Sequence, residues 1–439
     1  MPAGLPFPVP DFDPHIIPTR HLTADIPGTG GVLKQRDEDF IVEELPAYHP
    51  SGEGEHLYLW VQKRHMSTMH VVRLLADHFK VRRDAVGIAG LKDKIGITTQ
   101  MLSIHLPGKD APFGAFEHDN IQILWTDRHA NKLRRGHLLG NRFIIRIRST
   151  TAAKVVFAKK ALTALARLGV PNRIGSQRFG MVANNHLVGR ALLLKDFQGA
   201  INTLLGPSPN SPENQHDARR LFAECNFDAA LAAFPHGCHT ERRLLSMLAR
   251  GAPADQAVRA IERLEFGFYI TAFQSAVFNT LLDDRIASGR LAALEDGDLA
   301  FKHDSGAVFP IAPDMPAEDR SALADRLKSL EISPSGPMWG RDMTRASGPI
   351  ADAERAALEA TGVTEAVFAA MSRRDAETMV GQRRPMRVPL TFPDVEAGID
   401  ERGDYIKCVF ELPRGAFATT AMQEIMKTDP AALAEDSDD

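Results

Sequence analysis

Hydrophobic and polar residues alternate in several short segments of the N-terminal third of the chain. Each segment is rich in β-branched or aromatic residues and is bounded by Gly, Pro, Asn or Asp; the segments are 56–63, 86–89, 97–106, 121–125 and 140–148. Alternation with a period of two between turn residues predicts β-strands. In the last segment Phe143, Ile145 and Ile147 alternate with arginines, which predicts a half-buried strand with a basic outer face.

Helical spacing of apolar residues marks a different part of the chain. A first helix is predicted within 67–80, with Ser67 as its N-cap, and apolar residues recur every three or four positions through most of 172–385. Strand patterns return at 386–390 and 404–412. The sequence therefore predicts an α+β or mixed α/β protein in which a largely helical domain interrupts a sheet domain.

The predicted domains have the following bounds. Residues 1–171 and 386–428 form the two parts of the sheet domain, and 172–385 form the inserted domain. The segment 429–439 is acidic and is predicted to be disordered. Near the C-terminus Thr420 and Gln423 have the spacing of a capping box, which predicts a helix start there.

Composition excludes several classes of protein. The 439 residues are 44% hydrophobic, enough for two domains, yet no apolar run is long enough to cross a membrane, and the N-terminus lacks signal-peptide features. A cytoplasmic protein is therefore expected. The three cysteines form no CxxC pair, and HGCH at 236–239 lacks further ligands at a zinc spacing. PGTGG at 27–31 precedes no helix, so a dinucleotide fold is not indicated.

Charge is distributed unevenly along the chain. The net charge is −4, but residues 51–200 contain 24 Lys and Arg against 10 Asp and Glu. A basic zone within an acidic protein is typical of a nucleic-acid contact, and a solvated basic face is the alternative.

The stretch GLKDKIGITTQ, 90–100, places Asp93 between two lysines on a glycine-bounded loop that joins two predicted strands. Such a loop is a common location for a reactive group, and the lysines favour the ionised carboxylate. A solvated turn is the alternative. The basic stretch PNRIGSQRFG, 171–180, is similarly either a domain-boundary loop or a hinge that contacts phosphates.

Five patterns, taken in order, resemble the TruD family of tRNA pseudouridine synthases. They extend from residue 33 to about 427 and are LKQRDEDFIVEE at 33–44, AGLKDKIGITTQ at 89–100, GNRF at 140–143, PNRIGSQRFG at 171–180 and LPRGAFATTAMQEI at 412–425. In one position the chain departs from the family pattern, because Leu91 stands where many relatives have arginine. The cation that pairs with Asp93 is left open among Lys34, Lys92 and Lys94.

The resemblance implies a fold and a set of site residues. The fold is a catalytic domain with a mostly antiparallel sheet, interrupted by a largely helical TRUD domain. Asp93 is then the catalytic carboxylate, and Lys34 holds it by charge pairing. The remaining residues bind substrate: Phe40, Phe143 and Phe417 form apolar walls around a flipped base, Asn141 reads the uracil edge or a ribose hydroxyl, and Arg142, Arg173 and Arg178 contact the RNA backbone.

The resemblance also implies the reaction. Uridine is isomerised to pseudouridine, with uridine-13 in the D arm of tRNA as the usual target, and neither a cofactor nor a metal is needed. Whether Asp93 attacks C1′ or abstracts the 2′ proton stays open. We expect tRNA as the partner, tRNA-Glu foremost, and a monomer, since no long apolar heptads occur. A catalytically silent RNA-binding protein is the alternative, whereas a base deaminase would need a zinc site.

Overall fold

The computed structural model describes residues 20–108, 116–370 and 379–428, and the chain forms two compact units. We call His21–Val170 with the residues from Val388 onward the sheet unit, and Pro171–Arg387 with Arg20 the helical unit. The chain passes between them within β7, Val170–Pro171, and again within β12, Arg387–Val388. The predicted acidic tail, 429–439, lies outside the described residues.

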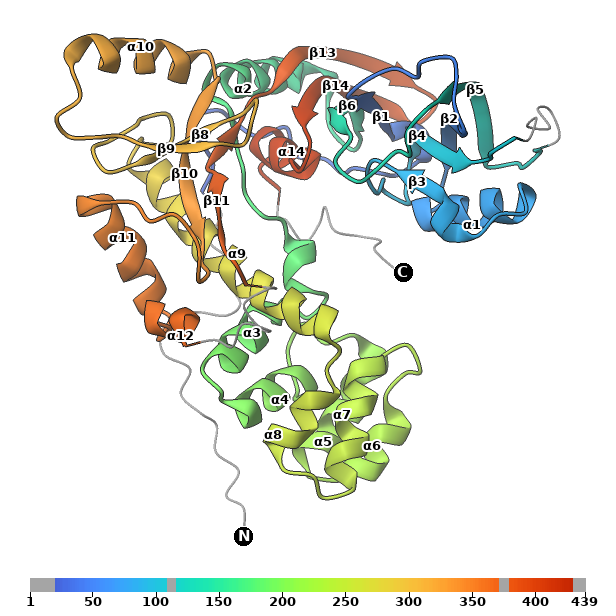
Figure 1. Cartoon of the computed structure of the whole chain (residues 1–439), viewed down its shortest axis with the longest axis vertical. Coiled ribbons are helices and arrows are strands. Elements are labelled where there is room, and N and C mark those ends of the chain that lie inside the picture. The colour runs from blue at the N-terminus through green and yellow to red at the C-terminus, as the bar shows by residue number, and fades with distance from the viewer. Residues whose placement is uncertain (1–19, 109–115, 371–378, 429–439) are drawn as a thin grey trace. The chain divides into compact units, whose positions relative to one another are not determined.

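An eight-stranded sheet forms the centre of the sheet unit, in the order β13-β14-β6-β1-β4-β2-β5, with β3 paired to β4. All of its pairings are antiparallel except β1 with β4. The strands are β1 Phe40–Pro46, β2 His56–Arg64, β3 Val86–Ile88, β4 Ile97–His105, β5 Ile121–His129, β6 Leu138–Ile147, β13 Thr391–Asp400 and β14 Gly403–Pro413. The blue, cyan and red strands of Figure 1 thus share one sheet. The predicted α+β fold with a mostly antiparallel sheet is confirmed.

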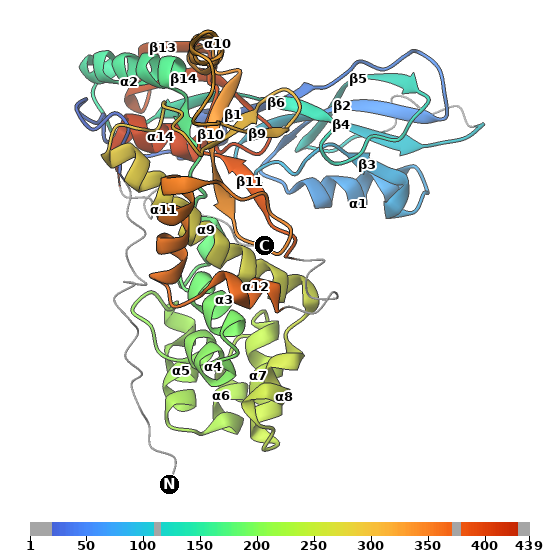
Figure 2. The ribbon, with the colours of Figure 1, turned by 60° about the vertical axis from the view of Figure 1, so that its left-hand side comes forward.

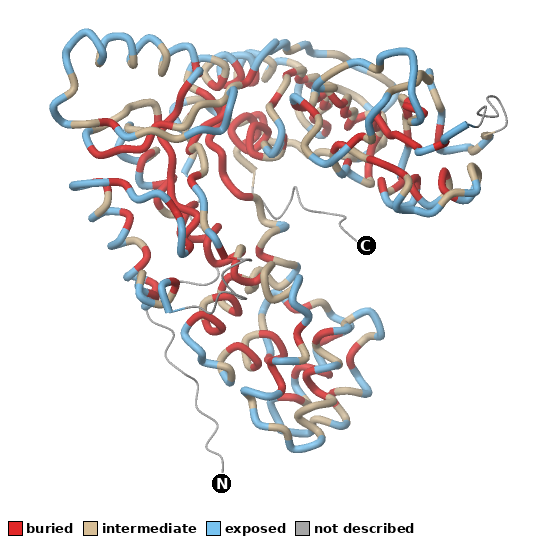
Figure 3. Tube along the Cα trace, viewed as in Figure 1, coloured by how far each residue is buried: buried red, intermediate tan, exposed pale blue. Residues whose placement is uncertain are grey.

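Three helices pack against this sheet: α1 Thr68–His78, α2 Val155–Leu168 and α14 Ala418–Met426. Apolar residues of α2 and α14 form one core with β1, β6 and β14, and α1 forms a second with β2 and β4 (Figures 1 and 3). Burial of these apolar faces holds the helices to the sheet. Ser67 caps α1 as predicted, because its Oγ accepts a hydrogen bond from the His70 amide at 3.3 Å. Short 3₁₀ turns are Asp37–Asp39, Arg83–Ala85 and Ala152–Lys154.

The helical unit is organised around the long helix α9, Arg263–Ala287, which is buried along much of its length (Figures 2 and 3). The other helices are α3 Asn185–Leu193, α4 Phe197–Leu205, α5 His216–Ala223, α6 Phe227–Ala233, α7 His239–Ala249, α8 Ala254–Ala257, α10 Ala317–Lys328, α11 Gly348–Glu359 and α12 Glu365–Ala369. A four-stranded sheet, ordered β11-β10-β8-β9, completes the unit: β8 Leu299–Lys302, β9 Val308–Pro310, β10 Ile332–Met338 and β11 Gln382–Pro385.

Two local predictions were wrong or incomplete. The capping box does not form: α14 begins at Ala418 with Phe417 at the N-cap, so Thr420 and Gln423 lie inside the helix and are buried. The sheet of the helical unit was missed, because its strand β10 reads ISPSGPM and contains prolines and a glycine that are typical of turns. None of the described helices is long and apolar enough to cross a membrane.

Candidate active site

The loop between β3 and β4 exposes Asp93 at the surface of the sheet unit. Leu91 is also exposed, at 59%, whereas Lys92 between them is buried. The chain therefore turns the lysine inward and the carboxylate outward. Because β3 and β4 belong to one sheet, the loop between them holds the Asp93 carboxylate in a defined position.

Hydrogen bonds to the side chains of Lys63, Thr68 and Asp37 help to hold the backbone of this loop. Lys63 Nζ donates to the carbonyl oxygen of Asp93 at 2.5 Å, and the Lys92 amide donates to Thr68 Oγ1 at 2.9 Å. The Gly96 amide donates to Asp37 Oδ1 at 3.1 Å. Gly96 has φ +107°, and a Cβ there would lie 2.2 Å from the Phe40 carbonyl oxygen, so only glycine fits the end of the loop.

A buried cluster of Lys92, Glu44 and Asn141 lies beneath the loop. Lys92 Nζ is 2.9 Å from Glu44 Oε2 and donates to Asn141 Oδ1 at 2.6 Å. Glu44 and Asn141 are cross-strand neighbours on β1 and β6, and Glu44 Oε1 also accepts from the Met101 amide. Burial raises the pKa of Glu44, and the Lys92 charge partly offsets this effect. Lys92 is thus engaged by Glu44 and Asn141.

Asn141 has a donor that this cluster does not use. Its Oδ1 accepts from Lys92, so the amide presents Nδ2 as a hydrogen-bond donor, and no partner for Nδ2 is found in the described part of the chain. An amide donor fixed in orientation by a buried lysine can bind a carbonyl oxygen, such as those of uracil.

Lys63 is a buried lysine whose ammonium donates to the backbone carbonyl of Asp93. It is 1% exposed on β2, and burial lowers its pKa to about 8, an effect that the Asp93 charge partly offsets. Lys34, which the resemblance assigns to hold Asp93, has its Nζ 4.5 Å from the centroid of the Phe40 ring. That geometry is a cation–π contact.

The three predicted aromatic walls have different surroundings. Phe40 and Phe143 are 2% and 6% exposed and belong to the core beneath α2 and α14, where Phe143 packs on Phe410 at a centroid distance of 5.7 Å. Phe417 is 43% exposed at the N-cap of α14. In this structure Phe417 offers an open face, whereas Phe40 and Phe143 support the strands that carry Glu44 and Asn141.

The three predicted backbone-binding arginines also differ. Arg142 is exposed on β6. Arg178, in the helical unit, is half-buried with its guanidinium 4.9 Å from the Phe268 ring centroid. Arg173 is 5% exposed and makes a bidentate ion pair with Asp283 on α9. The Arg173 guanidinium is therefore engaged by Asp283 inside the helical unit.

Two site residues were missed from the sequence, although a signal was present. Glu44 continues the inward alternation of Phe40 and Val42 on β1, and Lys63 continues that of Leu57, Leu59 and Val61 on β2. A charged residue at an inward position of a strand is costly to bury unless it is paired. Such positions are therefore candidates for a functional network. No group of three or more His, Cys, Asp or Glu side chains within the described ranges could hold a metal ion.

Comparison with known proteins agrees with this geometry. Residues 17–425 match the family model described as tRNA pseudouridine synthase D (TruD). Proteins named tRNA pseudouridine synthase D from Geobacter sulfurreducens and Geobacter metallireducens are 40% and 39% identical to this chain. The alignments cover 93% of this chain in both cases, and 97% and 98% of the relatives.

A solved structure is similar over the whole fold. A crystal structure from Methanosarcina mazei, assigned to tRNA pseudouridine synthase D, aligns with a TM-score of 0.82 and 28% sequence identity. The alignment covers 97% of this chain and 100% of the other. The chain therefore belongs to the TruD family of tRNA pseudouridine synthases, isomerases that convert uridine in tRNA to pseudouridine.

Proposed function

We propose that Asp93 is the catalytic carboxylate and that uridine-13, in the D arm of tRNA, is the target. The observation that carries this proposal is the pairing of an exposed carboxylate with a buried support. Asp93 is open to solvent, while Lys63 holds its backbone and the adjacent Lys92 is fixed by Glu44 and Asn141. A group held by such a rigid support can approach a reacting atom with little loss of conformational entropy.

The reaction needs a carboxylate near the ribose. The C1′–N1 bond breaks, the uracil ring turns, a C1′–C5 bond forms, and the C5 proton is lost while N1 gains one. Positive character develops at C1′ as the first bond breaks, and an adjacent carboxylate stabilises it, as in glycoside hydrolysis. Asp93 performs this role either by attack on C1′ or by removal of the 2′ proton.

Two residues of the sheet unit would recognise the flipped uridine. Asn141 Nδ2 is oriented by Lys92 and donates to a uracil oxygen. Phe417, 43% exposed, stacks on the base, an interaction worth about 1–3 kcal/mol. Extrusion of the uridine from folded RNA costs a few kcal/mol, which is of the same size.

The proposal extends to the rest of the protein and its partner. We assign the helical unit to the TRUD domain that interrupts the catalytic domain. Arg142 and Arg178 would contact the RNA backbone from their own units, and tRNA-Glu is the proposed substrate. Because the substrate is tRNA, the site of action is the cytoplasm, and one monomer carries all the residues named for catalysis.

The test uses an unmodified tRNA-Glu transcript incubated with wild type, Asp93→Asn or the control Asp77→Asn, in buffer with EDTA. Asp77 is an exposed carboxylate on α1 of the same unit. We expect pseudouridine at position 13 with wild type and the control, and a rate at least about 10⁴-fold lower with Asp93→Asn, while all three bind the transcript equally.

Three results would contradict the proposal in whole or in part. Turnover by Asp93→Asn at a wild-type rate would remove the catalytic assignment. Pseudouridine at another position, abolished by Asp93→Asn, would keep the carboxylate but exclude uridine-13. Binding without turnover by wild type would instead favour the RNA-binding alternative for this transcript.

A further inference from the structure

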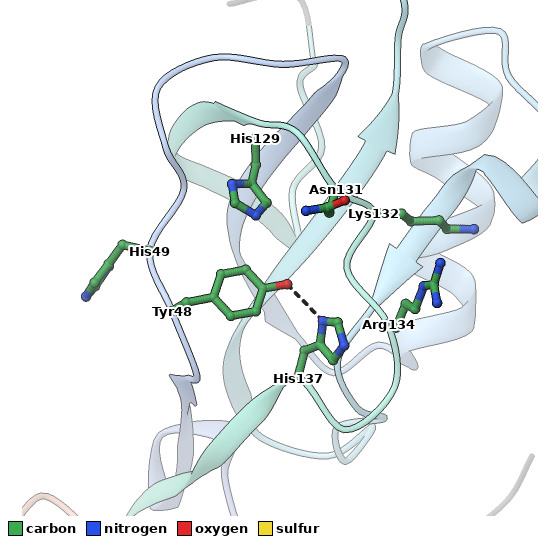
Figure 4. Close-up of a pocket in the computed structure, with 7 residues that line it drawn as sticks. All are labelled: Tyr48, His49, His129, Asn131, Lys132, Arg134 and His137. Carbon is green, nitrogen blue, oxygen red and sulfur yellow. Dashed lines mark hydrogen bonds between the residues drawn. The ribbon is translucent and has the colours of Figure 1, made fainter.

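The loop that joins β5 to β6, residues 130–137, lines part of two cavities. One cavity, of about 470 Å³, is shown in Figure 4. There the Tyr48 hydroxyl and His137 Nδ1 are 2.8 Å apart, so these polar groups satisfy each other. Lys132 and Arg134 also line this cavity but point away from Tyr48 and His137 (Figure 4). Both basic residues line the second cavity as well.

The second cavity has both apolar and basic residues in its lining. It has a volume of about 620 Å³, and we call it the β3 groove. Its apolar lining comes from α1, β3 and the loop, and its basic lining from the loop and the turn before β3. The groove is lined by Met69, Val72, Val86, Gly87, Ile88 and Leu133, by Arg83, Lys132, Arg134 and Arg135, and by Asp84. Asp84, the one carboxylate in this lining, pairs with Arg82 at 3.0 Å.

The loop 130–137 that lines the β3 groove is fixed in place by hydrogen bonds from its backbone amides. The Leu133 amide donates to Ser103 Oγ at 3.0 Å, and the Gly136 amide donates to the Ala89 carbonyl at 2.8 Å. Gly87 makes the close approach possible, since a Cβ there would lie 2.3 Å from the Leu133 carbonyl oxygen. The basic side chains therefore start from a backbone that is already ordered, which lowers the entropic cost of binding an anion.

β3, which lines the β3 groove, leads directly into the loop that holds Asp93. β3 ends at Ile88, and Asp93 follows in the next turn of chain. Met69, which is 53% exposed in the groove, adjoins Thr68, whose hydroxyl accepts a hydrogen bond from the Lys92 amide. A strand of RNA that places its target uridine at Asp93 would therefore pass near this groove.

We propose that the β3 groove binds a nucleotide that flanks the target uridine in the substrate RNA. Extrusion of one base removes a stacking partner from its neighbours, and the exposed Met69 offers an apolar surface to such a base. The phosphates on either side lie against Arg83 and Arg135, both of which are exposed. This inference rests on tRNA as the substrate and on Asp93 as the catalytic residue.

The test compares two double variants in an Asp93→Asn background, so that binding is measured without turnover. The groove variant is Arg83→Glu with Arg135→Glu. The control is Lys160→Glu with Arg167→Glu, two exposed residues of α2, which packs on β13 at the other edge of the sheet. Each pair changes the charge of the sheet unit by the same amount. Circular dichroism melting confirms that both fold.

We expect the groove variant to bind unmodified tRNA at least about 10-fold more weakly, with a salt slope reduced by about two, one for each lost phosphate contact. The control should stay within about 2-fold. Met69→Ala alone should weaken binding by several-fold without changing the salt slope, because it removes an apolar contact.

Equal losses in the two double variants would show general attraction to a polyanion, and unchanged affinity in the groove variant would show that RNA does not enter the groove. Either result overturns the inference. Failure of the proposed function is distinguishable, because it would be seen in the position or the Asp93 dependence of pseudouridine rather than in these affinities.

Discussion

One buried ion pair in each unit involves a cation named from the sequence, which is arginine in the helical unit and lysine in the sheet unit. In the helical unit Arg173 and Asp283 have side chains that are 6% and 4% exposed. In the sheet unit Lys92 and Glu44 are 4% and 0% exposed. The two pairs are therefore buried to a similar degree. Any difference in their roles must come from the chemistry of the partners and from the hydrogen-bonding groups that each pair leaves without a partner.

We call the Arg173–Asp283 pair the closed pair, because Arg173 donates to both carboxylate oxygens of Asp283. We call Lys92, Glu44 and Asn141 the open cluster, because Asn141 still presents Nδ2 as a donor. Both carboxylate oxygens of Asp283 accept from the Arg173 fork, and Oδ1 also accepts from the Arg20 amide at 3.0 Å. Lys92 instead divides its ammonium between Glu44 and the Asn141 amide and sits next to an exposed carboxylate. Arginine offers a planar fork that fixes geometry, and lysine offers a compact charge with rotatable donors. We infer that the first pair stabilises a fold and the second positions reactive groups.

The largest expected effect comes from breaking the closed pair. Arg173→Ala leaves the Asp283 carboxylate buried without its partner, which should cost about 3–5 kcal/mol of unfolding free energy. Urea unfolding followed by circular dichroism measures the loss, and hydrogen exchange in α9 locates it. The control Arg178→Ala, which removes a cation–π contact with Phe268, should cost about 1 kcal/mol.

A double variant sharpens this test. Arg173→Met with Asp283→Leu replaces the pair by apolar groups of similar volume and should recover most of the lost stability. A single-variant loss below about 1 kcal/mol would mean that the pair is not structural, and the comparison between the units would fail.

A smaller effect, on rate rather than on stability, is expected from the open cluster. Lys92→Met frees the Asn141 amide and removes the cation that stabilises ionised Glu44, so the site loses its alignment. We expect kcat to fall by about 10²-fold, with the Kd for tRNA unchanged within about 2-fold. Single-turnover pseudouridine formation and filter binding measure the two quantities.

The matched control is Lys160→Met, on the exposed face of α2, which should leave kcat at its wild-type value. Adding Glu44→Gln to Lys92→Met should change kcat little further, because Glu44 without its cation takes up a proton as burial raises its pKa. Equal losses of kcat and of tRNA affinity in Lys92→Met would indicate a purely structural lysine.

Local patterns predicted most of the sheet and the position of the loop that holds Asp93. Alternation placed the strands that became β2 to β6, and glycines on either side of Asp93 marked the loop. The same alternation contained Lys63 and Glu44 at inward positions, so these residues could have been found by asking which charged residue follows a run of buried ones.

Long-range pairing could not be predicted in this way. Arg173 and Asp283 are 110 positions apart, and no local pattern joins them. The stretch around Arg173 contains Pro, Gly and Asn, which are typical of an exposed loop, and its burial depends on how α9 packs in the helical unit. Likewise the burial of Phe40 and Phe143 depends on α2 and α14, which join their core from distant parts of the sequence.

The smallest expected effect is a pH dependence of the rate and of the stability, which Lys63 beside the Asp93 loop should produce. Its pKa of about 8 lies below the ordinary 10.5, so between these values the unfolded chain binds more protons than the folded chain, and stability should rise with pH. Over the same range Lys63 loses its charge beside Asp93 and Lys92, so the rate should fall a few-fold as pH passes 8. Between pH 6.5 and about 10 the rate of pseudouridine formation should therefore fall, while the free energy of unfolding measured in urea should rise. Lys63→Met should remove both trends. If the rate falls equally in Lys63→Met, another group titrates, and the cation that supports Asp93 must be sought outside β2.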